Sequence, residues 1–405
     1  MNFKSKNVDF LLLKLLLVSV FLLPSTTIFY FISFSLISLV LLPKIKLNKF
    51  NLIVCSTMFL IFIVGGSSQA HTTGASLSIE NVFKIILIIY LICASTVSGI
   101  DSKPEDTIKI KKTISFILIL IISSQIVIML NIEPIKSIIR DYYLNSDILL
   151  NIYQREFHAF SSRNGGLFGN PNQLSKAVTF IYIIYLSTST AHSSKNDLIF
   201  SLLCIVSIAL SGSRTGFAIL FITSFLFFFL KLNVRGKMAI ILTAFVGLSV
   251  VFYNELRVVS YTADSNEIGS LEYKIYFLIN YLEKIYSENI VSILFGSGFM
   301  DRGDLDNDVF SFGLNLGFDS DIGYIISFLG GIGFIFLIIN IFIMWFNGVI
   351  KTYMLPIFLW CVSSSVFYNV KSLIMLIIIV IISKTIFSRG TNEKACICNK
   401  YPNTL

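Results

Sequence analysis

Twelve apolar stretches, each long enough to cross a bilayer as a helix, run along this chain of 405 residues. A run of about 20 apolar residues suffices to span the hydrocarbon core. The stretches do not alternate between polar and apolar residues, which excludes the strands of a membrane β-barrel. The sequence therefore predicts an all-α, polytopic integral membrane protein with twelve transmembrane helices. We place these helices at 9–24, 26–43, 50–66, 80–99, 113–132, 171–188, 197–212, 215–231, 237–254, 321–347, 353–368 and 372–387.

The composition agrees with a membrane chain and argues against nucleic-acid binding. Hydrophobic residues make up 55% of the chain and charged residues 13%, whereas a soluble domain has about 25% charged residues. The net charge of +8 resides mainly in short connections between apolar stretches. Because no basic, aromatic-rich domain lies outside those stretches, we expect no nucleic-acid partner.

Lysine and arginine gather in every second connection, which predicts an orientation. Cytoplasmic connections of membrane proteins carry an excess of these residues, so this set should face the cytoplasm together with both termini. The opposite connections include 65–79, which has no lysine or arginine, and two long loops, 133–165 and 254–320. We expect one transmembrane domain, 1–387, with both loops on its outer face, and a cytoplasmic tail, 388–405.

Residues 161–172 end the first long loop and open a helix. Asn170 is a good N-cap, and Pro171 suits the first helical position. Free amides at this outward-facing helix start, together with Arg163, would suit an anion. We count Asn170 and Asn172 among the candidate binding residues. The alternative interpretation is a capped helix start with a flexible lead-in.

A tight turn on the same outer face has the sequence Ser-Gly-Ser-Arg-Thr-Gly at 211–216. Its arginine runs against the orientation rule, and an arginine near the membrane is costly unless it is paired, hydrated or extended to headgroups. Arg214 is therefore either a guanidinium fork for a phosphate or pyrophosphate or a side chain that reaches lipid headgroups. We interpret Lys84 and Lys176, near the ends of their stretches, in the second way.

The second long loop contains Arg257 and a stretch, 271–286, with apolar and aromatic residues at helical spacing. This pattern predicts an amphipathic helix on the membrane face, where Lys274 would meet headgroups or a lipid-linked substrate. Such a helix is either a structural cover or part of a site. A glycine-rich run, Leu-Phe-Gly-Ser-Gly at 294–298, follows it.

Two acidic residues, Asp319 and Asp321, open the tenth apolar stretch. Carboxylates stabilise a helix N-terminus through the helix dipole, so a capping role is one interpretation. The other is a general base at the membrane surface. Gly330, Gly331 and Gly333 follow in the same stretch and permit close helix packing.

We expect neither a metal nor a cofactor. The three histidines, His71, His158 and His192, have no ligand spacing. Residues 304–308 resemble the start of a calcium-binding loop, but the position that requires glycine holds Val309.

Taken together, these segments resemble a family. Gly-Leu-Phe-Gly-Asn-Pro-Asn at 166–172, the turn at 211–216, the run at 294–298 and the glycine-bearing tenth stretch are similar to motifs of the O-antigen ligase and Wzy-type O-antigen polymerase superfamily of bacterial envelope enzymes. The resemblance covers most of the chain from residue 150 to 350, whereas the first five stretches match only in hydropathy.

The resemblance implies a GT-C-like membrane glycosyltransferase that needs no metal and works at the periplasmic face of the bacterial inner membrane. It would join undecaprenyl-pyrophosphate-linked oligosaccharides into O-antigen, the polysaccharide of lipopolysaccharide, or into capsule. Its other partners would be membrane lipids and a chain-length regulator. Arg163 and Arg214, with Arg257 or Lys274 as a third cation, would stabilise the leaving pyrophosphate. Asp319 or Asp321 would deprotonate the attacking hydroxyl.

The chain departs from the family pattern at two places. The family often has arginine followed by tryptophan near Lys274, where this chain has lysine and Tyr276. The ligase branch typically has a histidine where this chain has Asp-Ser-Asp at 319–321, which favours a polymerase. An O-antigen ligase remains an alternative. A polytopic transporter or flippase of lipid-linked glycans is another, although it would need ionisable residues near the middle of the membrane, where this sequence is almost wholly apolar.

Overall fold

The computed structural model of the chain is all-α: most of the residues it describes are helical, and none of them forms a strand. The predicted fold class is confirmed at this level. The described residues are 3–24, 27–45, 49–73, 78–94, 104–143, 164–188, 195–231, 290–298, 321–346, 354–363, 366–367 and 369–383.

Each predicted apolar stretch that the structure describes contains a helix, although Val366 and Phe367, within the stretch 353–368, are not helical. The stretch 237–254 lies outside the described residues. The first half of the chain forms α1 (Phe3–Leu22), α2 (Thr27–Leu41), the short η1 (Leu42–Lys44), α3 (Lys49–Thr73), α4 (Ile79–Ala94), α5 (Pro104–Met129) and α6 (Ile135–Tyr143). The second half forms η2 (Gly166–Phe168), α8 (Pro171–Ser187), α9 (Lys195–Ser211), α10 (Arg214–Lys231), α13 (Ile290–Phe295), α15 (Asp321–Phe346), α16 (Met354–Ser363) and a last helix, Val370–Ser383.

One helix begins well before its predicted bound. The stretch 113–132 is apolar, but α5 already starts at Pro104, with Glu105 and Asp106 in its first turn. Proline at the first position and acids next to the positive end of the helix dipole both favour a helix start here. Hydropathy alone could not detect this polar first part of the helix.

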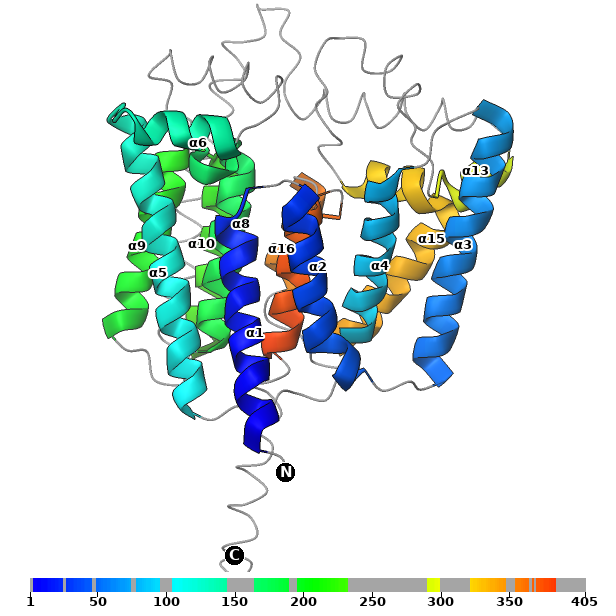
Figure 1. Cartoon of the computed structure of the whole chain (residues 1–405), viewed down its shortest axis with the longest axis horizontal. Helices are drawn as coiled ribbons and strands as arrows, with labels where there is room; N and C mark the ends of the chain where they lie inside the picture. The colour runs from blue at the N-terminus through cyan, green and yellow to red at the C-terminus, as the bar shows by residue number, and fades with distance from the viewer. Residues whose placement is uncertain are drawn as a thin grey trace, which may run out of the picture.

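Contacts at the two ends of the bundle show that successive long helices run in opposite directions (Figure 1). At one end, Lys371 in the first turn of the last helix contacts the end of α1, the start of α2 and η2. At the other end, Lys111 near the start of α5 pairs with Asp197 at the start of α9 and lies over the ring of Tyr185 near the end of α8. We call these the η2 end and the Lys111 end. The η2 end is uppermost in Figure 1.

The helices divide into two sides with a central group between them (Figure 1). Helices α5, α8, α9 and α10 form one side and contact one another. Helices α3, α4, α13 and α15 form the other side and likewise pack together. Helices α1, α2 and α16 lie between the two sides. The candidate motifs are therefore distributed over both sides of the η2 end.

Glycines bring α13 close to α15 and α3. Gly330 has a φ of 67° inside α15 and interrupts its helical geometry. A Cβ added there would lie 2.3 Å from the backbone of Leu294, and one added at Gly298 would lie 2.1 Å from the carbonyl oxygen of Phe62. The amide of Gly298 donates to the carbonyl of Phe328 over 3.0 Å. The close packing predicted at Gly330 is confirmed, and the glycine-rich run at 294–298 is its other half.

Lys84 and Lys176 do not extend outward as the sequence analysis predicted. Their exposed fractions are 3% and 0%. The Lys84 ammonium lies 2.9 Å from the carboxylate of Glu80 and 5.1 Å from the ring centre of Tyr324 in α15. The prediction that they snorkel was wrong, because neighbouring helices pack over both side chains.

Two described helices, Glu105–Met129 and Tyr324–Ile343, are long and apolar enough to cross a membrane by length and composition. The twelve-helix membrane architecture therefore stays a prediction. Shorter apolar helices among the described residues are Phe10–Leu22, Phe31–Lys44, Leu52–Ser68, Asn196–Ser211, Thr215–Phe227 and Val370–Ser383.

The packing of α3 on α4 predicts a specific cross-link. The sulfur atoms of Cys55 and Cys93 lie 3.6 Å apart, and neither cysteine forms a disulfide. Oxidation with copper phenanthroline should join them, since a small shift brings the sulfurs to the roughly 2.05 Å of a disulfide. With the other cysteines replaced and a protease site inserted between the helices, the cleaved protein should stay in one piece until it is reduced. Cys55→Ser is the control, and two fragments after oxidation would contradict this packing.

Candidate functional site

Two motif segments, 164–172 and 211–216, meet at the η2 end. The backbone amide of Asn164 donates to the carbonyl of Ser211 over 3.2 Å. The side-chain nitrogen of Asn164 donates to the carbonyl of Gln125 over 2.8 Å. One asparagine thus joins the end of the first long loop to α9 and to α5.

Asn170 caps α8, as the sequence predicted. Its side-chain oxygen accepts the amides of Asn172 and Gln173 over 2.8 and 3.4 Å, and Pro171, which has no amide hydrogen, occupies the first helical position. The sequence analysis assumed free amides at this helix start, but the cap engages them. An anion bound here could instead use the side-chain nitrogens of Asn170 and Asn172.

Ser213 joins the starts of α8 and α10. Its hydroxyl donates to the side-chain oxygen of Asn172 over 2.8 Å and accepts the amide of Gly216 over 3.1 Å, which makes Ser213 the N-cap of α10. The hydroxyls of Ser175 and Ser211 lie 2.8 Å apart. A Cβ added at Gly216 would lie 2.4 Å from the Cβ of Ser175, so this position requires glycine.

A buried glutamine joins two of the helices that form the site. Gln125 is fully buried, and its side-chain nitrogen donates to the carbonyl of Ser207 over 2.9 Å. The Ser207 hydroxyl donates to the Gln125 side-chain oxygen over 2.7 Å. Because the carboxamide uses both its oxygen and its nitrogen, it fixes α5 against α9. Sequence reasoning missed Gln125, although a glutamine inside an apolar stretch was the available signal.

The structure places the backbone, but not the side chains, of two predicted catalytic residues. Arg214 is the first residue of α10, and Asp321 is the first residue of α15. Figure 1 shows α10 and α15 on opposite sides of the bundle, so the described backbone does not bring Arg214 and Asp321 together. Four further predicted site residues lie outside the described part of the chain: Arg163, Arg257, Lys274 and Asp319.

Sequence reasoning also missed Lys371. Its side chain is 7% exposed, its ammonium donates to the carbonyl of Leu23, and it lies 5.0 and 5.4 Å from the ring centres of Phe29 and Phe168. Among the described residues, no carboxylate forms an ion pair with it. The orientation rule that singled out Arg214 would have found it, since the connection before the last apolar stretch should face outward.

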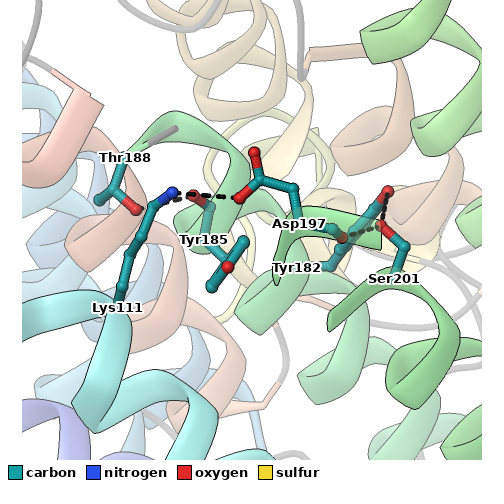
Figure 2. A network of polar contacts seen from close by, with 6 residues as sticks. All are labelled: Lys111, Tyr182, Tyr185, Thr188, Asp197 and Ser201. Carbon is teal, nitrogen blue, oxygen red and sulfur yellow. Dashed lines mark hydrogen bonds and ion pairs between the residues drawn. The ribbon is translucent and has the colours of Figure 1, made fainter. Parts of the chain in front are cut away.

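A second polar cluster lies at the Lys111 end (Figure 2). The ammonium of Lys111 lies 3.2 Å from the carboxylate of Asp197, which is 1% exposed, and 4.7 Å from the ring centre of Tyr185. The hydroxyl of Tyr182 lies 3.1 Å from that of Ser201. These contacts connect α5, α8 and α9. Since the cluster lies at the end away from the motif segments, we assign it a structural role.

Replacing Ser213 with alanine should lower the stability of the isolated protein. The change removes the N-cap of α10, worth about 1 kcal/mol, and leaves the Asn172 oxygen without its donor, which costs another 1–3 kcal/mol, roughly. Thermal unfolding in detergent would measure the effect. Ser187→Ala is a matched control, because the Ser187 hydroxyl donates only to the Ile183 carbonyl one turn earlier in its own helix. Equal midpoints for the two variants would contradict the role of Ser213.

In the described part of the chain, no three His, Cys, Asp or Glu side chains gather into a metal-binding group. No family model matches the chain, and no curated protein matches it.

Proposed function

We propose that the chain is a polytopic membrane glycosyltransferase that polymerises repeat units of O-antigen or capsular polysaccharide. It would reside in the bacterial inner membrane and act, without a metal, on undecaprenyl-pyrophosphate-linked oligosaccharides at the periplasmic face. The observation that carries the proposal is the hydrogen bond between Asn172 and Ser213. This bond unites the two family-like motifs immediately before Arg214.

The outward faces of the helices support placement in a membrane. Large apolar side chains in several helices point away from the bundle, with exposed fractions of 62% for Leu52, 57% for Phe116, 59% for Ile335 and 60% for Phe358. Surface helices of soluble proteins present polar residues outward. Large exposed apolar surfaces indicate contact with a membrane or a partner. Their presence on α3, α5, α15 and α16 favours lipid on both sides of the bundle.

The described cations support the predicted orientation. Connections and helix ends at the Lys111 end carry Lys44, Lys49, Lys109, Lys195 and Lys231. An excess of lysine marks the cytoplasmic side of a membrane protein. The η2 end, with both motif segments, would then face the periplasm.

The proposed reaction makes one glycosidic bond and breaks one phosphoester bond. A hydroxyl oxygen of one lipid-linked unit attacks the anomeric carbon of the growing chain. The bond from that carbon to the pyrophosphate oxygen breaks, and undecaprenyl pyrophosphate leaves with the electron pair. Asp319 or Asp321 takes the hydroxyl proton. Because negative charge develops on the pyrophosphate, Arg214 and Arg163, with Arg257 or Lys274 as a third cation, would stabilise it.

Deletion of the gene, followed by gel analysis of the surface glycan, tests the proposal. Loss of a polymerase should leave lipid A core, or the corresponding acceptor, with a single repeat unit, and a plasmid copy should restore the long chains. Loss of a ligase would instead leave no attached unit, while lipid-linked polymer accumulates. Loss of a flippase would leave single lipid-linked units that do not reach the periplasm. Either of these last two outcomes would reject the polymerase.

A further inference from the structure

The η2 end contains a cation, Lys371, that the proposed reaction does not use. This residue is buried, with an exposed fraction of only 7%. An ammonium has three N–H donors, but the only hydrogen-bond acceptor that the described residues offer is the carbonyl of Leu23. Its remaining contacts are the ring faces of Phe29 and Phe168. These contacts leave the positive charge without a described counter-ion.

The position of Lys371 within its helix makes this charge more unfavourable. It lies in the first turn of Val370–Ser383, where the helix dipole is positive and favours an anion. The helix start is already capped, since the side-chain oxygen of Asn369 accepts the amide of Ser372 over 3.1 Å. Without an anion beside it, a buried lysine in such a place tends to lose its proton, and a nearby negative charge favours the charged form.

Phe168 connects Lys371 to the motif that ends the first long loop. The ring of Phe168 lies between the backbone of η2 and the ammonium, 5.4 Å from the latter. The turn that presents this ring is fixed by Gly166 and Gly169, which have φ values of 51° and 68°. Asn170 follows directly and caps α8. The cation therefore adjoins the segment that carries the candidate binding residues Asn170 and Asn172.

We propose that Lys371 binds a phosphate oxyanion of the ligand that occupies the η2 end. The identification of that ligand as the pyrophosphate of a lipid-linked glycan rests on the proposed function. Lysine is a compact point charge that accepts an oxyanion from many directions, whereas an arginine fork imposes one orientation. Lys371 would hold the pyrophosphate, while Arg214 would orient it. The two aromatic rings limit water around the ammonium and so strengthen the attraction.

Binding to the purified full chain in phosphatidylcholine nanodiscs tests this role. The probes are farnesyl diphosphate, inorganic pyrophosphate, farnesol and added phosphatidylglycerol, with thermophoresis as the measurement. Lys371→Met should weaken the affinity for farnesyl diphosphate by about tenfold or more, because a charge-assisted contact is lost, and it should leave farnesol binding unchanged. Lys136→Met is the matched control, since Lys136 lies near the same end and already pairs with Glu133 over 3.5 Å.

A second neutral variant keeps the test decisive if the methionine variant does not fold. Lys371→Gln retains an N–H donor for the Leu23 carbonyl but carries no charge, so it should show the same loss of affinity. A lower unfolding temperature without ligand, combined with unchanged diphosphate affinity, would make Lys371 a structural cation and overturn the proposal. A loss that concerns only added phosphatidylglycerol, and neither diphosphate, would assign the contact to bilayer lipid and also overturn it.

The failure of this inference and the failure of the proposed function can be told apart. Long surface glycans that persist after gene deletion would reject the polymerase, yet they leave the diphosphate affinities of the Lys371 variants unaffected. Conversely, wild-type affinity in both Lys371 variants would reject this inference while a deletion strain still lacked long chains.

Discussion

Replacing Arg214 with alanine should abolish long glycan chains while the protein remains in the membrane at its normal level. Arg214 is the first residue of α10, but the cap of this helix is made by the side chain of Ser213, which the substitution leaves intact. The helix start should therefore persist without the guanidinium. Removing one donor to a developing oxyanion typically lowers kcat by roughly 10² to 10³. A gel of the surface glycan and an immunoblot of the membrane fraction would measure both quantities.

Arg214→Lys distinguishes a fork from a simple positive charge. A lysine cannot reproduce the two parallel N–H bonds of a guanidinium, so it should restore long chains only weakly. Lys136→Ala, at a partly buried site near the same end, controls for the loss of a cation in general. Long chains in the alanine variant would remove Arg214 from the mechanism. Full rescue by lysine would show that the reaction needs only a positive charge at position 214 and not a bidentate guanidinium.

The second large effect is expected at the two acidic residues at the start of the tenth apolar stretch. If one carboxylate is the general base, then Asp319→Asn or Asp321→Asn should nearly eliminate polymerisation, because an amide cannot accept the hydroxyl proton. If both residues only cap α15, each change should be mild, since asparagine caps a helix as well as aspartate does. The measurement is the rate of chain growth from purified lipid-linked repeat units in nanodiscs.

Comparing the residual activities of the two variants would also show which carboxylate is the base. Asp321 is the first residue of α15, where a carboxylate interacts favourably with the helix dipole, and a modest decrease there would fit that interaction alone. A near-complete loss in one variant with a modest loss in the other would identify the base. Retention of most activity in both variants would exclude these carboxylates as the base.

Much of the secondary structure could be predicted because apolar runs are long and uninterrupted. Within the described residues, every predicted stretch contains a helix, and the cap at Asn170 with Pro171 was predicted from local chemistry. Local rules succeed here because capping and hydropathy depend on neighbours in the sequence. The polar first part of α5 was missed for the same reason, since Pro104 and two acids start a helix before the apolar residues begin.

The arrangement of the site could not be predicted, because it depends on contacts between distant segments. Nothing in the sequence near Asn172 indicates that its oxygen accepts from Ser213 in another helix. Lys84 was expected to reach headgroups, but helix packing buries it. Lys371 was overlooked because its partners, at residues 23, 29 and 168, are brought together only by the fold.

The contact of Gly216 with Ser175 restricts how the proposed enzyme could change its sugar preference. Any residue larger than glycine at 216 would push α8 and α10 apart, since its Cβ would lie 2.4 Å from that of Ser175. Separated helices would displace the beginning of α10 and, with it, the residue expected to meet the leaving group. Variation in acceptor and donor saccharides between related strains should therefore accumulate in the connecting segments, while the spacing of these two helices stays constant.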